Sequence, residues 1–215
     1  MSTAEKLKVT PREYAALEER SEVRHEFHRG EVFAMAGASL AHNAIVANIT
    51  RRLNEQLEDG PCIAVGSDMR VKVEATGLHT YPDVVVLCGE PEFDHEVPNT
   101  LLNPIVLVEV LSESTERYDR RTKSGHYRRI ESLREYLLVA QDECLVEQYV
   151  RADRGHWILT DANDPEEAVT LESIGCTLRL ADIYAKIEMP PPKDDIPPAA
   201  DEVREPRAAD EPRGF

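Results

Sequence analysis

Hydrophobic residues recur every four positions in one stretch of the chain and form unbroken runs in two others. The spaced apolar positions are Ile45, Ile49, Leu53 and Leu57. This spacing predicts an amphipathic helix over residues 40–57, with Ser39 as its cap. The two runs, residues 84–88 and 105–111, are typical of central strands that are covered on both faces.

Shorter patterns complete the predicted order of elements. The sequence Thr-Pro-Arg-Glu at residues 10–13 has the arrangement of a helix capping box with an early proline. Residues 25–33 read as two short strands around a turn at Arg29-Gly30. The other predicted elements are strands at 62–65, 69–73 and 136–140, a helix at about 115–131, and a hairpin of 144–150 with 156–160. This order predicts an α/β or α+β fold, with a mixed sheet flanked by helices and a C-terminal hairpin.

The last 27 residues differ in composition from the rest of the chain. From Met189 onward the chain holds seven of its 14 prolines and almost no large apolar residue. Such a segment cannot bury enough surface to offset the entropy lost on ordering. We therefore predict one domain over residues 1–188 and a disordered, proline-rich acidic tail over 189–215.

Charge and cysteine content narrow the class of protein. The chain of 215 residues has 41 acidic and 25 basic residues, a net charge of −16, which excludes a protein that coats nucleic acid or binds membranes through basic surfaces. It has no run of 18 apolar residues that would span a membrane and no apolar signal segment at its start. Its four cysteines lie far apart without a CxxC motif, which favours reduced thiols in a cytoplasmic protein.

Glu109 is the one charged residue in the apolar run 105–111. Because side chains alternate along a strand, Glu109 shares a face with Leu107 and Leu111. A buried carboxylate is costly unless it is paired or binds a metal ion. The alternative is that Glu109 ends the strand and faces solvent, or pairs with an arginine.

Asp83 is a second candidate, since Pro82 holds the chain extended just before the run 84–88. An aspartate in this place is also an ordinary turn residue. Two carboxylates on neighbouring central strands would make an oxygen-rich site that suits Mg²⁺. No histidines or cysteines cluster with Asp83 and Glu109 as a transition-metal site would require.

A cation beside these carboxylates would help the site act on phosphates. Asp119, Lys123 and Tyr127 are spaced four residues apart, on one face of the predicted helix that follows Glu109. The alternative for Lys123 is a surface ion pair with Asp119, which contributes little. Arginines 120, 121, 128 and 129 form the one dense basic stretch, which either meets phosphates or is a solvated helix face.

Taken together, these patterns resemble the Uma2 family over about residues 10–185. The matching motifs are Glu26 to Glu31 (EFHRGE), Ser39-x-x-His42, Ser67 to Val71 (SDMRV), Tyr81-Pro82-Asp83, Ile105 to Ser112 with Glu109, Asp119-x-x-x-Lys123-x-x-x-Tyr127 and Glu135 to Val139. That family is similar to the PD-(D/E)xK nuclease superfamily, whose core is a four-stranded mixed sheet flanked by helices.

The resemblance implies roles for particular residues. Asp83 and Glu109 match the acidic residues that bind Mg²⁺ in the superfamily, and a lysine there activates water. Leu111 stands where that lysine is expected, so Lys123, from the following helix, is the candidate here. Glu26 is a further candidate metal ligand, or else an exposed hairpin charge. His42 either faces the site or is a helix-cap or surface residue.

The sequence therefore predicts an endonuclease that hydrolyses phosphodiester bonds in DNA with Mg²⁺, or with Mn²⁺ in its place. A homodimer would place two such sites on opposite strands. The missing lysine at Leu111 and the acidity of the chain favour the alternative, a catalytically weak or inactive nuclease fold that binds a partner.

Overall fold

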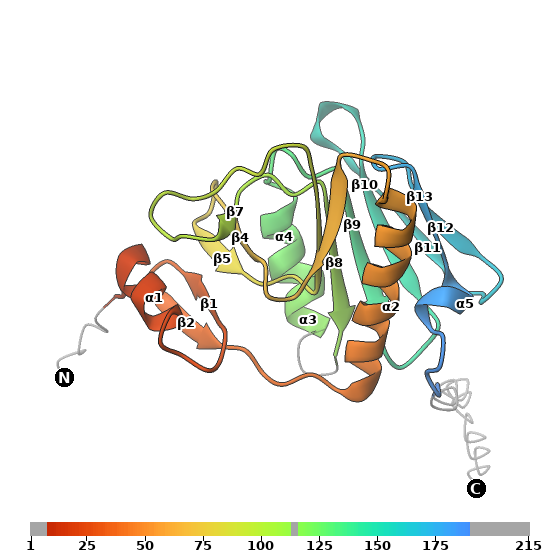
Figure 1. Ribbon diagram of the computed structural model, residues 1–215, viewed down its shortest axis with the longest axis horizontal. Helices are drawn as coiled ribbons and strands as arrows, with labels where there is room; N and C mark the ends of the chain where they lie inside the picture. Colours follow the sequence, from red (N-terminus) through yellow and green to blue (C-terminus); the bar gives the residue numbers. More distant parts are fainter. Residues whose placement is uncertain (1–7, 113–115, 190–215) are drawn as a thin grey trace, which may run out of the picture.

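The structure is a computed structural model of the 215-residue chain, and it describes residues 8–112 and 116–189 (Figure 1). The predicted tail lies outside these residues except for Met189, so the tail and the domain boundary at 188 stay predictions. Within the described ranges, no helix is long and apolar enough to cross a membrane.

A six-stranded mixed sheet forms the centre of the fold. Its strands run in the order β11-β10-β9-β8-β6-β3, with β8 and β9 parallel and every other pair antiparallel. The strands are β3 (Cys62–Gly66), β6 (Val84–Cys88), β8 (Val106–Leu111), β9 (Glu135–Ala140), β10 (Val146–Arg151) and β11 (Trp157–Ala162). The predicted mixed sheet is confirmed, and the predicted hairpin is β10–β11, which extends the sheet at one edge.

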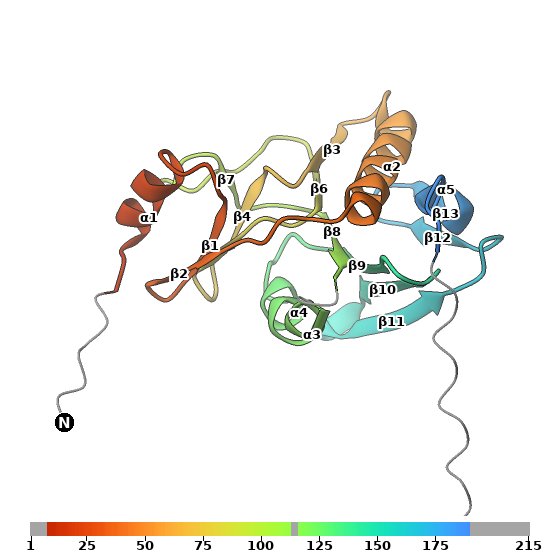
Figure 2. The ribbon, with the colours of Figure 1, turned by 90° about the horizontal axis from the view of Figure 1, so that it is seen from below.

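Helices cover both faces of this sheet (Figure 2). Helix α2 (Leu40–Leu57) buries its four spaced apolar residues against alternate valines of β6 and β8. Beneath α2, the hairpin of β12 (Ala168–Leu171) with β13 (Cys176–Arg179) and the short helix α5 (Leu180–Ile183) complete that core. The opposite face, which carries Leu107 and Leu111, packs against the segment that contains Tyr127.

That second covering segment is less regular than the predicted helix over 115–131. It consists of α3 (Glu116–Tyr118), a π-helical turn η1 (Asp119–Lys123) and α4 (Ser124–Tyr127), and 113–115 lie outside the described residues. The predicted helix is therefore confirmed over 116–127, but it contains a π-helical turn and ends before residue 131. A π-turn adds a residue to a helical turn and is common at functional sites. Here it carries two buried charged residues, Asp119 and Lys123, on the side that faces the sheet.

A second, five-stranded sheet holds the N-terminal part of the chain, in the order β2-β1-β5-β4-β7. Its strands are β1 (His25–His28), β2 (Glu31–Ala34), β4 (Arg70–Val73), β5 (Leu78–Thr80) and β7 (Thr100–Leu101). Helix α1 (Pro11–Glu18), which has the predicted capping box, stacks Tyr14 on Phe27 of this sheet. Only three residues, Tyr81 to Asp83, separate β5 from β6 of the central sheet, so they join the two sheets.

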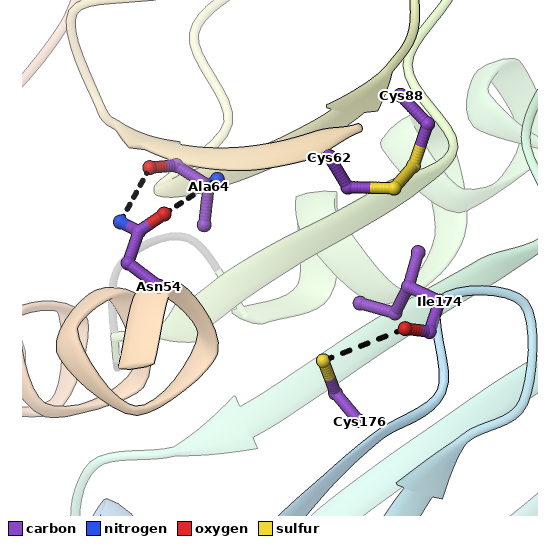
Figure 3. The surroundings of a disulfide bond; sticks show 6 residues. All are labelled: Asn54, Cys62, Ala64, Cys88, Ile174 and Cys176. Atoms are coloured by element: carbon purple, nitrogen blue, oxygen red, sulfur yellow. Dashed lines mark hydrogen bonds between the residues drawn. A yellow bond between two sulfur atoms is a disulfide. The ribbon is translucent and has the colours of Figure 1, made fainter. Parts of the chain in front are cut away.

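The prediction of four reduced cysteines is wrong for two of them. Cys62 and Cys88 form a disulfide that joins β3 to β6 (Figure 3). The antiparallel register pairs these residues directly, with Cα atoms 3.9 Å apart, which linear spacing does not reveal. Cys144 and Cys176 are free thiols. A cytoplasmic location stays a prediction, and the disulfide removes part of its basis.

Asn54 provides a test of how helix α2 holds the edge strand β3. Its side chain amide donates to the carbonyl of Ala64 at 2.8 Å and accepts from the Ala64 N–H at 3.0 Å (Figure 3). Asn54→Ala should lower the free energy of unfolding by about 1–3 kcal/mol, because both backbone groups lose their partner. Asn43 is exposed on the same helix, so Asn43→Ala should change the free energy of unfolding by less than about 0.5 kcal/mol. Equal losses in urea titrations of the two variants would contradict this.

His79 makes stability sensitive to acid. Its ring is 1% exposed beneath α1 and lies edge-on to Tyr14 and Phe27. Burial lowers its pKa below the usual 6.5, although a hydrogen bond with Asp94 opposes this. The unfolded chain then takes up the proton first, so this contribution to stability is present above pH 6.5 and is lost as pH falls below it.

The thermal midpoint should therefore fall between pH 7 and pH 5. His79→Gln should remove the contribution of one proton to the pH dependence of the unfolding free energy, at most about 1.4 kcal/mol per pH unit. His156→Gln, on the exposed β10–β11 loop, is the control and should leave the pH dependence as in the wild type. A His79→Gln profile parallel to that of the wild type would refute this role.

Candidate active site

The register of the central sheet brings Asp83 and Glu109 together. Strands β6 and β8 pair Val84 with Val108, so one further step of the ladder sets Asp83 opposite Glu109. Directly opposed side chains have Cβ atoms about 4.5–5.5 Å apart. Glu109 is 3% exposed, which rules out the alternative that it ends the strand facing solvent. The two carboxylates thus lie side by side on the sheet face that carries Leu107 and Leu111 and packs against the segment with Tyr127.

Both oxygens of Asp83 have a partner that fixes the carboxylate. Oδ2 accepts a hydrogen bond from the backbone N–H of Val110 at 2.7 Å. Oδ1 lies 3.0 Å from Nε2 of His42, in the first turn of α2. The backbone N–H of His42 donates to the side chain of Ser39, which is the N-cap, so His42 is not itself the cap and its ring faces the site.

Lys123 lies at the point where Glu109 and two further carboxylates converge. Its Nζ is 3.2 Å from Glu26 Oε1, 3.2 Å from Glu109 Oε1 and 3.3 Å from Asp119 Oδ1. Lys123 is 6% exposed, so the alternative of a surface pair with Asp119 is wrong. Glu26, 7% exposed, is likewise not an exposed hairpin charge. One ammonium group therefore joins β1, β8 and η1.

Hydroxyl groups also donate hydrogen bonds to Glu26 and Glu109. Tyr127 donates to Glu109 Oε1 at 2.6 Å. Thr80 and Tyr118 donate to the two oxygens of Glu26, at 2.5 and 3.0 Å. Sequence reasoning placed Tyr127 on the same helix face as Lys123, but it missed Thr80 and Tyr118, whose only signal is their proximity in space.

Electrostatics in this cluster follow from burial and mutual repulsion. Burial raises the pKa of Glu109 well above its usual range, and the charges of Asp83 and Asp119 add to this against the ammonium of Lys123. For Lys123, burial opposes the charged form, but Glu109, Glu26 and Asp119 outweigh it and raise the pKa well above its usual value. The carboxylates therefore favour the charged form of Lys123, and added positive charge beside Glu109 would favour its ionised form.

The basic stretch of arginines 120, 121, 128 and 129 does not form one common set of contacts. Arg120 forms ion pairs with Glu116 and Glu147. Arg128 bonds to the carbonyl of Ser124, while Arg121 and Arg129 are exposed. The stretch is thus not a single phosphate-binding surface, and only part of it is open to a ligand.

Comparison with known proteins places this arrangement in a family. The Uma2 family, described as "Putative restriction endonuclease", matches residues 11–181. This chain belongs to the Uma2 family. It is 37% identical over 153 residues to uncharacterized protein sll1609 of Synechocystis sp., covering 71% of this chain and 86% of that protein. It is 33% identical over 177 residues to uncharacterized protein slr1290 of the same organism, covering 82% and 92%.

A solved structure supports the fold of this Uma2 member. The crystal structure of a "putative nuclease belonging to DUF820" from Anabaena variabilis superimposes with a TM-score of 0.66. The match covers 82% of this chain and 97% of that one at 18% sequence identity. It confirms the expected nuclease-like mixed α/β fold and shows the fold alone.

The donor atoms of the Uma2 site suit a hard divalent cation. Asp83 and Glu109 offer only carboxylate oxygens, and Mg²⁺ binds through one or two carboxylates while keeping several waters. Among the residues that the structure describes, no three histidine, cysteine or acidic side chains form a ready metal cage. The residues that would hold such a cation are Asp83 and Glu109, and Lys123 already engages Oε1 of Glu109.

Removal of the central cation should destabilise the fold. Lys123→Met leaves buried carboxylates of β1, β8 and η1 without their shared cation, and should lower the free energy of unfolding in EDTA by about 3–5 kcal/mol. Arg51→Met removes an exposed ion pair with Glu55 and should have little effect, because water screens such pairs. Similar urea midpoints for Lys123→Met and wild type would show that the cluster does not depend on the ammonium.

Proposed function

We propose that this protein is a metal-dependent endonuclease that hydrolyses phosphodiester bonds in DNA, with Asp83 and Glu109 holding Mg²⁺ or Mn²⁺. The observation that carries the proposal is the buried group in which two opposed carboxylates lie beside a lysine, with Lys123 Nζ 3.2 Å from Glu109 Oε1. Membership of the Uma2 family and the nuclease-like fold support the reaction class.

The residues of the chain divide the work in the proposed reaction. A divalent cation bound there polarises a phosphoryl oxygen and lowers the pKa of bound water. Lys123 orients the attacking water and offsets negative charge that develops on the phosphate. Asp119 and Glu26 hold the lysine in place, and Tyr127 holds Glu109. His42 and the Val110 N–H fix the orientation of Asp83.

Three observations favour a second candidate, a nuclease fold that binds a partner without efficient cleavage. The ammonium of Lys123 is already engaged by three carboxylates, and Leu111 replaces the expected lysine. The net charge of −16 also repels a polyanion, although salt screens this beyond about 8–10 Å. A homodimer stays a prediction under either candidate.

Cleavage of single- and double-stranded DNA with Mg²⁺, with Mn²⁺ and with EDTA tests the first candidate. Glu109→Gln, Asp83→Asn and Lys123→Met should each reduce the rate by about 100-fold or more, because each removes charge aimed at the reacting phosphate. Glu135→Gln is a matched control: Glu135 is 1% exposed on the neighbouring strand β9, and it bonds to Gln148 and the Ser173 N–H, outside the cluster.

The outcomes separate the two candidates. Metal-dependent cleavage that survives in Glu135→Gln and is lost in the three site variants supports the endonuclease. If the wild type does not cleave, but Mg²⁺ raises its thermal midpoint and fails to raise that of Glu109→Gln, the binding protein is favoured. Cleavage that persists in Glu109→Gln would sink the proposed mechanism.

A further inference from the structure

Two histidines form a second contact directly beside the carboxylate cluster. Glu26 and His28 are two residues apart, on the same side of β1, while Lys123 and His126 are three apart on the segment η1–α4. The Glu26–Lys123 ion pair is 3.2 Å long, and the rings of His28 and His126 have centroids 4.8 Å apart. The same strand and helix therefore make two successive contacts, the first acidic and the second formed by imidazoles.

The histidine contact has hydrogen-bonding capacity that the protein does not use. Nδ1 of His126 lies 2.8 Å from the Thr76 hydroxyl. Nε2 of His28 is buried and has no hydrogen-bond partner among the described residues. Buried polar atoms are normally satisfied by protein, water or a ligand. Neither ring forms an ion pair with a carboxylate within the described ranges.

Two exposed arginines flank the pair. Arg29 is at the tip of the β1–β2 hairpin and Arg129 follows α4. Arg29 directly follows His28, and the backbone N–H of Arg129 donates to the carbonyl of His126 at 2.9 Å. Burial lowers the pKa of the His126 ring, and the charges of His28, Arg129 and Arg29 add to this while Glu26 opposes it. No described carboxylate forms an ion pair with either arginine. Two guanidinium groups therefore adjoin the histidine pair beside the carboxylate cluster, and Glu31, opposite His28 in the hairpin, is the acidic residue that acts on His28.

We propose that His28, Arg29, His126 and Arg129 form a subsite for a backbone phosphate of the nucleic acid substrate. This inference rests on the proposed function. It implies that the bound strand extends from the carboxylates toward the two histidines. Two residues of strand separate the contacts by about 7 Å, which corresponds to an axial rise of about two nucleotides. The subsite thus holds a phosphate about two nucleotides from the reacting one and supplies local attraction that the whole chain lacks.

The anion site can be tested without cleavage or metal. Inorganic phosphate is titrated into the full chain in EDTA, and the histidine ring signals are followed by NMR. The signals of His28 and His126 should shift and saturate, while that of His156, on the exposed β10–β11 loop, should not. If His28 and His126 respond no more than His156, the subsite is overturned.

The nucleic acid assignment uses a pair of matched arginine variants. Arg29 and Arg154 both have left-handed backbone angles, φ 52° and 59°, and both are exposed and precede a glycine. Glycine suits that conformation, so Arg29→Gly and Arg154→Gly remove the same charge with little risk to folding.

Binding of a labelled single-stranded oligonucleotide is then measured in EDTA across salt concentrations. Arg29→Gly should weaken binding about fivefold at 0.1 M salt and lower the salt slope by about 0.7, the effect of one lost phosphate contact. Arg129→Gln should act similarly, and Arg154→Gly should match the wild type. Equal effects of Arg29→Gly and Arg154→Gly would overturn the assignment to a strand of nucleic acid.

The two proposals fail separately in these experiments. Absence of metal-dependent cleavage in the wild type counts against the proposed function, while saturable phosphate shifts at His28 and His126 would still support the anion subsite. Cleavage without those shifts would retain the endonuclease and overturn the subsite.

Discussion

The structure depends on one buried ammonium group. Lys123 is held by Glu26, Glu109 and Asp119, which come from the small sheet, the central sheet and the π-helical turn. Carboxylates this close in a medium of low dielectric repel one another strongly, and each would be costly to bury alone. The lysine compensates that repulsion and, in doing so, fixes the two sheets and the covering segment around a single point.

The backbone determines which groups can reach that point. Tyr81-Pro82-Asp83 passes from β5 to β6, so the turn that joins the two sheets also delivers Asp83 beside Glu109. The π-turn places Asp119 and Lys123 on the side facing the sheet. Both oxygens of Asp83 and of Glu26, and Oε1 of Glu109, have a donor or a cation as partner, so these carboxylates are held in fixed positions.

Much of the site was predictable because its residues break local patterns. Glu109 interrupts an apolar run, Asp83 follows a proline, and Lys123 shares a helical spacing with Asp119 and Tyr127. The roles of Thr80 and Tyr118 were not predictable, since neither residue departs from its local pattern. Each contacts Glu26 from 54 or more positions away in the chain. The partner of His42 is Asp83, which is 41 residues away in the chain, so local patterns could not identify it.

The sequence by itself determined the elements whose signals are short in range: the capping box of α1, the span of α2 and the apolar strands β6 and β8. These follow from spacing and local hydrogen bonding, which act over a few residues. Only the tertiary structure decided the split into two sheets, the π-turn in the covering helix, the Cys62–Cys88 disulfide and the meeting of three carboxylates around Lys123. Those depend on strand register and on burial, which are set by contacts between residues far apart in the chain.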